Sequence, residues 1–298
     1  MVRTDSETAS GVTLDLPRAR ECAIESVSLI GSEQAGIINT FGKTLAESID
    51  GEEIISKGTV IGPSEMSMLA RMGKPGIAVR RKPKVAVITT GADVVEIVED
   101  IRPGQVRNVA RYEIVGMVLE SGCEVGRLIH VRDEASGLEK AISESLGSDA
   151  IIIALGSKDS HEIAVTALKN LGDIRFAQVR LAPGFATAFA MVEGRPAFIV
   201  PEAAALESFE ALIRPALLTM LGRTAVDRKK VTATISAAVK LDSKLTHYIR
   251  ALTVFEDGRY VVKPFDSHRH ECLNSLIVVG ANVESVRRGD EVEVMMLA

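Results

Sequence analysis

The sequence has few aromatic residues. Tryptophan is absent, tyrosine occurs three times, and aromatic residues make up 4% of the 298 residues. Apolar residues nevertheless reach 46%, so the chain can bury a large core of aliphatic side chains, in one large domain or in two to three smaller ones. This composition favours an aliphatic α/β protein over an aromatic-rich β sandwich.

Cysteine is also scarce. Cys22, Cys123 and Cys272 are far apart and odd in number, which argues against a disulfide framework and against a CxxC metal site. Metal-ligand residue types cluster once, in His268-Arg269-His270-Glu271-Cys272, where alternate residues would share one face of a strand. We expect a polar loop there, with a zinc or copper site as the alternative.

The sequence lacks both an excess of one charge sign and a long apolar run. It has 40 acidic and 35 basic residues, interspersed along the chain, with a formal charge of -5, and this gives no sign of a nucleic-acid surface. No apolar run approaches the roughly 18–20 residues that cross a bilayer, and the polar N-terminus has no signal-peptide core. We therefore expect a cytoplasmic protein with no nucleic-acid partner and no membrane partner.

The most informative stretch is residues 84–91, Lys-Val-Ala-Val-Ile-Thr-Thr-Gly. A short β-branched run that ends at Thr-Thr-Gly is typical of a parallel strand buried on both faces. In open α/β sheets, ligands bind just beyond the carboxyl ends of such strands. Thr90 and Gly91 would there offer a hydroxyl and a close backbone approach, although an ordinary strand-to-loop turn explains the same residues.

Strand and helix patterns alternate after this stretch. Asn108 is a suitable N-cap for a helix that ends near Ser121, and a second buried strand at 150–155 again ends at a glycine, Gly156. A strand is expected at 125–131, helices at 135–146, 161–171 and 203–221, and a hairpin turn at Glu193-Gly194-Arg195. Strands that alternate with helices of this length predict βαβ units and a parallel sheet.

The two ends of the chain have different patterns. Residues 1–12 are expected to be disordered, residues 16–28 predict a helix, and Ser64 is the expected N-cap of a helix ending at Gly73. From Lys229 onward only short strands are indicated, with Asp257-Gly258 as a hairpin turn. The sequence thus divides into an N-terminal segment (1–75), an α/β domain (76–222) and a small all-β domain (223–298).

The order of these landmarks resembles that of the MoeA-type molybdopterin molybdenumtransferases, the group that includes the gephyrin E domain. Residues 82–91 resemble the start of the family's molybdopterin-binding domain, and residues 104–108 its "GQI…N" turn. Residues 181–184 resemble its "KPGKP" loop, and residues 194–201 its strand into "LPGNP". The resemblance implies a three-layer α/β/α molybdopterin-binding-like domain followed by a small C-terminal all-β, barrel-like domain.

The resemblance also implies a chemistry. The family's enzymes bind adenylylated molybdopterin, use Mg²⁺ and molybdate, and insert the metal into the dithiolene. The implied ligand is therefore a small anionic pterin or a nucleotide, and a homodimer is expected by the same analogy. The candidate catalytic residues are Asp93 and Glu162, the candidate Mg²⁺ ligands are Asp93 and Asp159, and the candidate ligand-binding residues are Thr90, Gly91, Asn108, Gly156, Ser157, Lys158, Pro183 and Gly184. The simpler explanation of the acidic residues is that they are solvated loop and helix-start side chains.

Several positions depart from the family's motifs. Ala92 replaces the aspartate of "TGDEL", and Ala182 and Phe185 stand where "KPGKP" has its lysines. "LPGNP" has become Val200-Pro201-Glu202-Ala203-Ala204, and the "GGVSxGxxD" loop retains one glycine. The domain that carries a "DGYA" motif is missing before residue 56. Two hypotheses follow: a molybdopterin-biosynthesis protein with weakened or lost catalysis, or a non-catalytic binding module for a pterin, a nucleotide or a protein partner.

Overall fold

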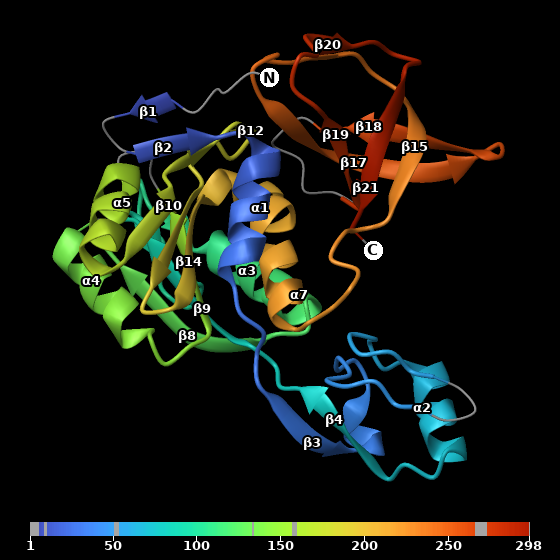
Figure 1. Ribbon diagram of the computed structural model, residues 1–298. Coiled ribbons are helices and arrows are strands. Elements are labelled where there is room, and N and C mark those ends of the chain that lie inside the picture. The colour runs from blue at the N-terminus through green and yellow to red at the C-terminus, as the bar shows by residue number, and fades with distance from the viewer. Residues whose placement is uncertain are drawn as a thin grey trace.

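The computed structural model describes residues 6–8, 11–50, 54–132, 134–156, 160–265 and 273–297. These residues form an α/β domain, a small lobe that projects from it, and a β domain made of the C-terminal strands (Figure 1). Within these ranges, none of the helices combines the length and the apolar character that crossing a bilayer requires.

The α/β domain contains a six-stranded sheet in the order β10-β13-β14-β9-β5-β8. The strands are β5 (Lys84–Thr90), β8 (Glu124–Val131), β9 (Ala150–Leu155), β10 (Asp173–Phe176), β13 (Ala188–Val192) and β14 (Arg195–Pro201). The four strands β14, β9, β5 and β8 are parallel, which confirms the predicted βαβ arrangement. Thr90 pairs with Leu155, and Leu155 pairs with Pro201, so three neighbouring strands end at the same edge of the sheet.

Helices cover both faces of this sheet (Figure 1). One face carries α1 (Leu16–Ser26), α3 (Val109–Glu120), α6 (Ala205–Ser208) and α7 (Arg214–Met220), and the other carries α4 (Ala135–Glu144) and α5 (Ser160–Leu171). Side chains of β5 alternate between the two cores: Val85 and Val87 contact the first layer, while Ala86 and Ile88 contact the second. Each fully buried aliphatic side chain contributes about 1.5–3 kcal/mol, so the predicted aliphatic core is sufficient for a three-layer domain.

The predicted helix at 203–221 is confirmed but is not regular. A π-helical segment, η3 (Phe209–Ile213), lies between α6 and α7. Pro215 lacks a backbone N–H and cannot donate to the carbonyl of Ala211, so the regular bonding is interrupted there. The segment is buried on all sides, which explains why it is apolar apart from Glu210.

Two predictions for the first 75 residues are wrong. Part of the segment expected to be disordered forms the strands β1 (Ser6–Thr8) and β2 (Gly11–Leu14), and β2 pairs with β11 (Gln178–Val179). The partner strand is remote in sequence, so no local pattern indicates the pairing. The helix α2 (Pro63–Arg71) begins one residue before the predicted cap; Gly62 is its N-cap, and the Gly62 N–H donates to the carboxylate of Glu65 at 2.8 Å.

The projecting lobe has its own small core. Strands β3 (Ser32–Gly36) and β4 (Gly76–Arg80) pair antiparallel and connect the lobe to the α/β domain. The short helix η1 (Ile37–Thr40) and α2 complete it. Buried side chains of this lobe include Leu45, Ile55, Ile61, Leu69 and Val79.

The C-terminal strands form a closed, barrel-like β domain, as expected. Its main strands are β15 (Lys230–Ile235), β17 (Thr246–Glu256), β18 (Arg259–Pro264), β19 (Ser275–Val279) and β21 (Glu291–Met296), and a short pair joins β16 (Val239–Lys240) to β20 (Ser285–Val286). Asp257 and Gly258 both have positive φ, 49° and 78°, which confirms the predicted hairpin turn. A strand of the α/β domain, β12 (Leu181–Ala182), pairs with the start of β17.

A buried ion pair fixes the linker between the two domains. Glu210 of η3 is 4% exposed, and its carboxylate accepts hydrogen bonds from Nε and Nη2 of Arg228 at 3.1 and 2.8 Å. Nη1 of Arg228 also donates to the carbonyl of Leu297 at 2.7 Å and lies 2.7 Å from the Glu120 carboxylate. Burial opposes the charge of Arg228, but the hydrogen bonds and charges of Glu210 and Glu120 outweigh it, and the pKa of the guanidinium is raised.

We expect Arg228→Met to lower the free energy of unfolding by about 3 kcal/mol, because it leaves the Glu210 carboxylate buried without its main partner. Urea denaturation measures the change. The exposed pair Lys43–Glu33 is the control, and Lys43→Met should cost less than about 1 kcal/mol. The double variant Arg228→Met/Glu210→Met should recover part of the loss; a double variant as unstable as the sum of both single variants would contradict the role of this pair.

Candidate functional site

The carboxyl edge of the sheet brings two glycines together. Gly91 follows β5 with a φ of 146°, and Gly156 follows β9. A Cβ atom placed on Gly156 would lie 2.5 Å from the carbonyl oxygen of Thr90, and one on Gly91 would lie 2.5 Å from Cγ2 of Val94. A side chain at Gly156 would therefore force the two strand ends apart, and one at Gly91 would collide with Val94.

Thr90 ends β5 with a buried hydroxyl that has no hydrogen-bond partner. Its side chain is 3% exposed, and it points to the same layer as Ala86 and Ile88, where α4 and α5 lie. A buried hydroxyl without a partner costs about 1–3 kcal/mol, so a ligand that supplies the partner recovers that energy. Helix α5 begins on this side of the sheet, and backbone N–H groups at a helix start attract anions.

The preceding residue, Thr89, points to the opposite layer and belongs to a polar network. Nδ2 of Asn108 donates to the Thr89 hydroxyl at 2.8 Å and to Oε1 of Glu96 at 2.9 Å. Oδ1 of Asn108 accepts from the backbone N–H of Arg111, which confirms Asn108 as the N-cap of α3. Asn108 thus connects the tip of β5 to the start of α3 and to the loop that precedes it.

This network extends to His130, a residue of β8. The Thr89 hydroxyl lies within hydrogen-bond distance of Nδ1 of His130, 3.1 Å away. His130 pairs with Thr89 in the sheet, so the network reaches the end of the strand next to β5.

The loop after β12 lies at the same edge of the sheet, because β13 begins opposite the end of β14. Gly184 is buried with a φ of 119°, and a Cβ atom there would lie 2.9 Å from the Ser208 hydroxyl. That hydroxyl is hydrogen-bonded to Thr187 at 2.8 Å. Pro183 and Phe185 are exposed, so the Phe185 ring does not fill the space beside the glycines.

Glu202 directly follows β14 and is half-buried against the start of α3. Burial raises the pKa of its carboxyl, the nearby Glu113 carboxylate raises it further, and a hydrogen bond from the Ala110 N–H opposes both. Ala110 is in the first turn of α3. Glu202 therefore supplies a carboxylate at a helix start that would otherwise attract an anion from solution.

An arginine from the β domain meets these acidic residues. Arg250 of β17 donates from Nε and Nη2 to the two carboxylate oxygens of Glu207 at 2.7 and 3.2 Å. Nη2 also lies 3.8 Å from Glu113. Burial by itself would lower the pKa of the Arg250 guanidinium. The hydrogen bonds and charge of Glu207, together with the charge of Glu113, outweigh burial and raise that pKa. Arg250 is therefore already paired.

The two candidate catalytic carboxylates are not part of this buried arrangement. Asp93 is exposed in the turn after β5, and Glu162 is exposed in the first turn of α5. The neighbouring His161 is buried, its Nε2 lies 3.0 Å from the Ala177 carbonyl, and burial lowers its pKa. Ser157, Lys158, Asp159 and the cluster His268 to Cys272 lie outside the described residues. The structure therefore brings together Thr90, Gly91 and Gly156, with Gly184 at the same edge and Asn108 on the opposite face of β5.

A separate cleft of about 590 Å³ lies at the opposite edge of the sheet, and its lining includes Arg81, Lys84 and Asp149. Arg81 and Asp149 form a bidentate pair at 2.6 and 2.6 Å, and the Lys84 N–H donates to the same carboxylate at 2.8 Å. Burial by itself would raise the pKa of the Asp149 carboxyl, but these hydrogen bonds outweigh burial and lower that pKa. Because Arg81 and Asp149 already satisfy each other, the glycine-bearing edge with its unpartnered Thr90 hydroxyl is the stronger candidate.

Sequence reasoning missed the roles of Thr89, His130, Glu113 and Glu207. The alternation of side chains along β5 could have separated Thr89 from Thr90, since only one of two consecutive residues faces each layer. The other three residues act through partners 41 to 137 residues away, and no local pattern indicates such pairs.

The raised pKa of Glu202 leads to a pH-dependent prediction. The Glu202 carboxyl holds its proton more tightly in the folded state than in the unfolded chain. The free energy of unfolding therefore falls as the pH rises from about 4.3, the usual pKa of glutamate, through the raised pKa of the folded state. Glu202→Gln should therefore be more stable than the natural protein at pH 7, with a difference that shrinks towards pH 4. Thermal unfolding at both pH values measures it, with Glu162→Gln as an exposed control; a destabilised Glu202→Gln at pH 7 would contradict the argument.

Comparisons with known proteins agree with this fold. Residues 86–219 match the family model described as a probable molybdopterin binding domain, and residues 232–297 match the MoeA C-terminal region (domain IV). Molybdopterin molybdenumtransferase 1 of Mycobacterium tuberculosis is 27% identical over 265 residues, which cover 83% of this chain and 62% of that protein. The Bacillus subtilis molybdopterin molybdenumtransferase is 23% identical over 270 residues, 87% of this chain and 63% of that protein.

The fold has close neighbours among solved structures. The molybdopterin biosynthesis MoeA protein from Pyrococcus horikoshii superposes with a TM-score of 0.81 at 19% identity, covering 95% of this chain and 99% of that chain. The chain spans about three fifths of the length of the curated relatives it matches, 62% for the first of them. The two matched domains, their order and the shared fold show that the chain belongs to the MoeA-type family, as a divergent member.

Proposed function

We propose that this protein acts in molybdopterin cofactor biosynthesis by binding an anionic pterin at the carboxyl edge of β5 and β9, and that its metal-insertion chemistry is weakened or lost. The buried Thr90 hydroxyl without a partner is the observation that carries this proposal. Thr90 directly precedes Gly91, whose backbone approaches that of Gly156 closely, and α5 begins on the side of the sheet to which the hydroxyl points. A phosphate oxygen of the pterin would accept the Thr90 proton, and backbone amides would bind the remaining oxygens.

The charges around this edge support binding more than catalysis. Transfer of an oxyanion such as molybdate needs fixed positive charge close to the reacting atoms. The loop at 181–185 contributes no cation, since alanine and phenylalanine stand at 182 and 185. Arg250 is paired with Glu207, and Glu113 and Glu202 add further negative charge on the α3 side of the sheet. These features would repel molybdate.

A resident magnesium site does not fit the described residues. Mg²⁺ usually takes one or two carboxylates together with phosphate and water oxygens. Among the residues the structure describes, no group of three His, Cys, Asp or Glu side chains converges as a metal site. Asp93 and Glu162 are exposed on separate segments. The proposed function therefore includes pterin binding and no step on a protein-held metal.

Calorimetry with molybdopterin and with its adenylylated form tests the binding proposal. Thr90→Val keeps the shape of the side chain and removes only the hydroxyl, so it should weaken binding about tenfold, equivalent to about 1.4 kcal/mol. Its unfolding midpoint should stay equal or rise, because the hydroxyl has no partner to lose.

Thr40→Val is a matched control for this variant. Thr40 is equally buried, and its hydroxyl donates to the Ile37 carbonyl at 2.6 Å in the projecting lobe. This variant should lose stability and keep its affinity for the pterin, the reverse of Thr90→Val. If neither form of molybdopterin binds the natural protein, the proposal fails; binding of adenine nucleotides alone would instead favour the non-catalytic nucleotide module.

The proposed loss of catalysis has its own test. The protein incubated with adenylylated molybdopterin, Mg²⁺ and molybdate should retain the pterin and yield little or no metal-loaded product, because the loop at 181–185 supplies no cation and Arg250 is paired with Glu207. Metal analysis of the released pterin measures this. A catalytically competent MoeA-type enzyme, assayed in parallel, shows that the assay works. Rapid metal insertion by this protein would overturn the proposed loss while leaving the binding site intact.

A further inference from the structure

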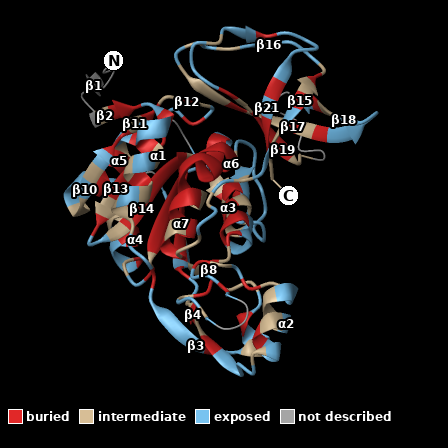
Figure 2. Ribbon diagram, turned by 45° about the vertical axis from the view of Figure 1, so that its right-hand side comes forward, coloured by how far each residue is buried: buried red, intermediate tan, exposed pale blue. Residues whose placement is uncertain are grey.

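The cleft at the amino edge of the sheet has no role in the function proposed above. It measures about 590 Å³, a size that suits a small metabolite, and it lies where the projecting lobe joins the α/β domain. All of its lining residues except Gly147 are charged. Figure 2 shows β3 and β4 of the lobe below β8, at the end of the α/β domain away from the β domain.

Two ion pairs account for part of the charge in this cleft. Arg81 and Asp149 form the bidentate pair described above, and Nζ of Lys43 lies 2.5 Å from Oε1 of Glu33. The first pair belongs to the α/β domain and the second to the lobe. Each pair is locally neutral, so neither of them attracts a ligand of one charge sign.

The remaining charges in the lining are mostly positive. Lys82 and Lys84 are exposed, and their ammonium groups have no partner among the described residues. The one lining carboxylate outside the two ion pairs is Glu124, at the start of β8. The unpaired part of the lining therefore carries a net positive charge, although the whole chain has a formal charge of -5.

Arg223 adds a third cation in the wall of this cleft. Its Nε donates to the Thr44 hydroxyl at 3.4 Å, and Thr44 directly follows the lining residue Lys43. Its Nη2 lies against Gly122, since a Cβ atom placed on that glycine would be 2.6 Å away. Gly122 is two residues before the lining residue Glu124.

The guanidinium of Arg223 is half-buried without a counter-charge. Among the described residues no carboxylate pairs with it, and burial lowers its pKa. The Cys123 thiol, close enough to feel both Arg223 and Lys82, supplies no negative charge, because burial raises its pKa to about 12. A buried cation without a partner costs stability, so an anionic ligand at this position would recover that energy.

The helix ends at this edge do not account for the unpaired cations. The carboxyl ends of α3 and α4 carry partial negative charge, which lysine side chains often complement. Here the chain itself supplies partners: the Cys123 N–H donates to the Val118 carbonyl at 3.2 Å, and Nη1 of Arg127 donates to the Glu144 carbonyl at 3.0 Å.

We propose that this cleft binds a small anion that carries a diphosphate group, with Lys82, Lys84 and Arg223 as its cationic ligands. A guanidinium donates to phosphate oxygens through two parallel N–H groups, and the two ammonium groups act as flexible point charges. Three cations against one free carboxylate leave two positive charges, which matches a ligand with at least two negative charges. Because the lining comes from both parts of the chain, the ligand would also connect the lobe to the α/β domain.

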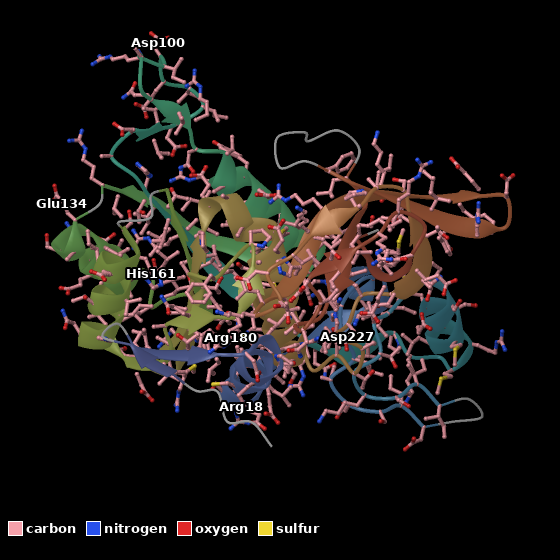
Figure 3. All side chains as sticks on the ribbon, turned by 90° about the horizontal axis from the view of Figure 1, so that it is seen from above. Arg18, Asp100, Glu134, His161, Arg180 and Asp227 are labelled. Atoms are coloured by element: carbon pink, nitrogen blue, oxygen red, sulfur yellow. The ribbon has the colours of Figure 1, made fainter. Side chains whose placement is uncertain are left out.

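This cleft is separate from the glycine-bearing edge. Strand β5 runs from Lys84, in the cleft, to Thr90, at the other edge, and its seven residues span roughly 20 Å. The loop after β5, labelled at Asp100 in Figure 3, projects away from the lobe. One phosphate group cannot contact both edges, so the proposed diphosphate site does not depend on pterin binding.

Calorimetry with inorganic pyrophosphate and with ADP, both without Mg²⁺, tests the site. Both probes should bind the natural protein, and Lys82→Gln/Lys84→Gln should weaken binding at least tenfold. This variant should fold normally, because both side chains are exposed. Tighter binding of ADP than of pyrophosphate would assign the ligand to the nucleotides, and equal binding would assign it to free diphosphate.

A second pair of lysines provides the matched control. Lys240 and Lys263 are exposed on the β domain, so Lys240→Gln/Lys263→Gln changes the net charge by the same amount away from the cleft. This control should keep the affinity of the natural protein. If the two double variants lose affinity equally, the anion responds only to overall charge and the proposal is overturned.

Arg223→Gln separates a binding role from a structural one. It should weaken pyrophosphate binding about tenfold, while its unfolding midpoint without ligand stays equal or rises, because no carboxylate loses a partner. A lower midpoint with unchanged affinity would overturn the assignment of Arg223.

Thr90→Val distinguishes this site from the pterin site. It should leave pyrophosphate binding unchanged, since Thr90 lies at the other end of β5. Pyrophosphate binding that Thr90→Val removes, or that survives Lys82→Gln/Lys84→Gln, would overturn the proposal, as would a natural protein that binds neither probe. None of these results alters the outcome of calorimetry with molybdopterin, so the two proposals fail independently.

Discussion

The parallel pairing of β5 with β9 and of β9 with β14 is the constraint on which the rest of the α/β domain depends. Because Thr90, Leu155 and Pro201 are aligned, every loop that leaves these strands starts from one edge of the sheet. The close approach at Gly156 requires the absence of a side chain, which links the position of the strands to residue identity at their tips. The edge is thus determined by backbone pairing, and the side chains around it can diverge while the fold persists.

That divergence separates binding from chemistry. Thr90 offers an unpartnered hydroxyl on the side of the sheet where α5 begins, and the backbone there needs no particular side chain to attract an anion. On the other side, α3 lies beside the carboxylates of Glu202 and Glu207, and Arg250 is bound to Glu207. The proposed function follows from this contrast: the backbone part of the site would hold a phosphate, whereas the paired arginine would be less able to act on an oxyanion.

Much of the fold could be predicted from the sequence because its signals are local. The strand at 84–90, the Asn108 cap and the Asp257-Gly258 turn each depend on residues within a few positions. The failures have the opposite origin. Strand β2 is ordered by a partner more than 160 residues away, and the bonding between Arg250 and Glu207 spans 43 residues. For the site, the residue types at the strand tips were predictable, whereas the pairing that neutralises its charges was not.

Helix α3 connects these features physically. Its first residue follows Asn108, which holds the tip of β5; its middle carries Glu113, which approaches Arg250 of the β domain; its end carries Glu120, which pairs with Arg228 of the linker. A helix held at three points along its length is a rigid element. A change in α3 therefore acts on a helix that already links the tip of β5 to the β domain.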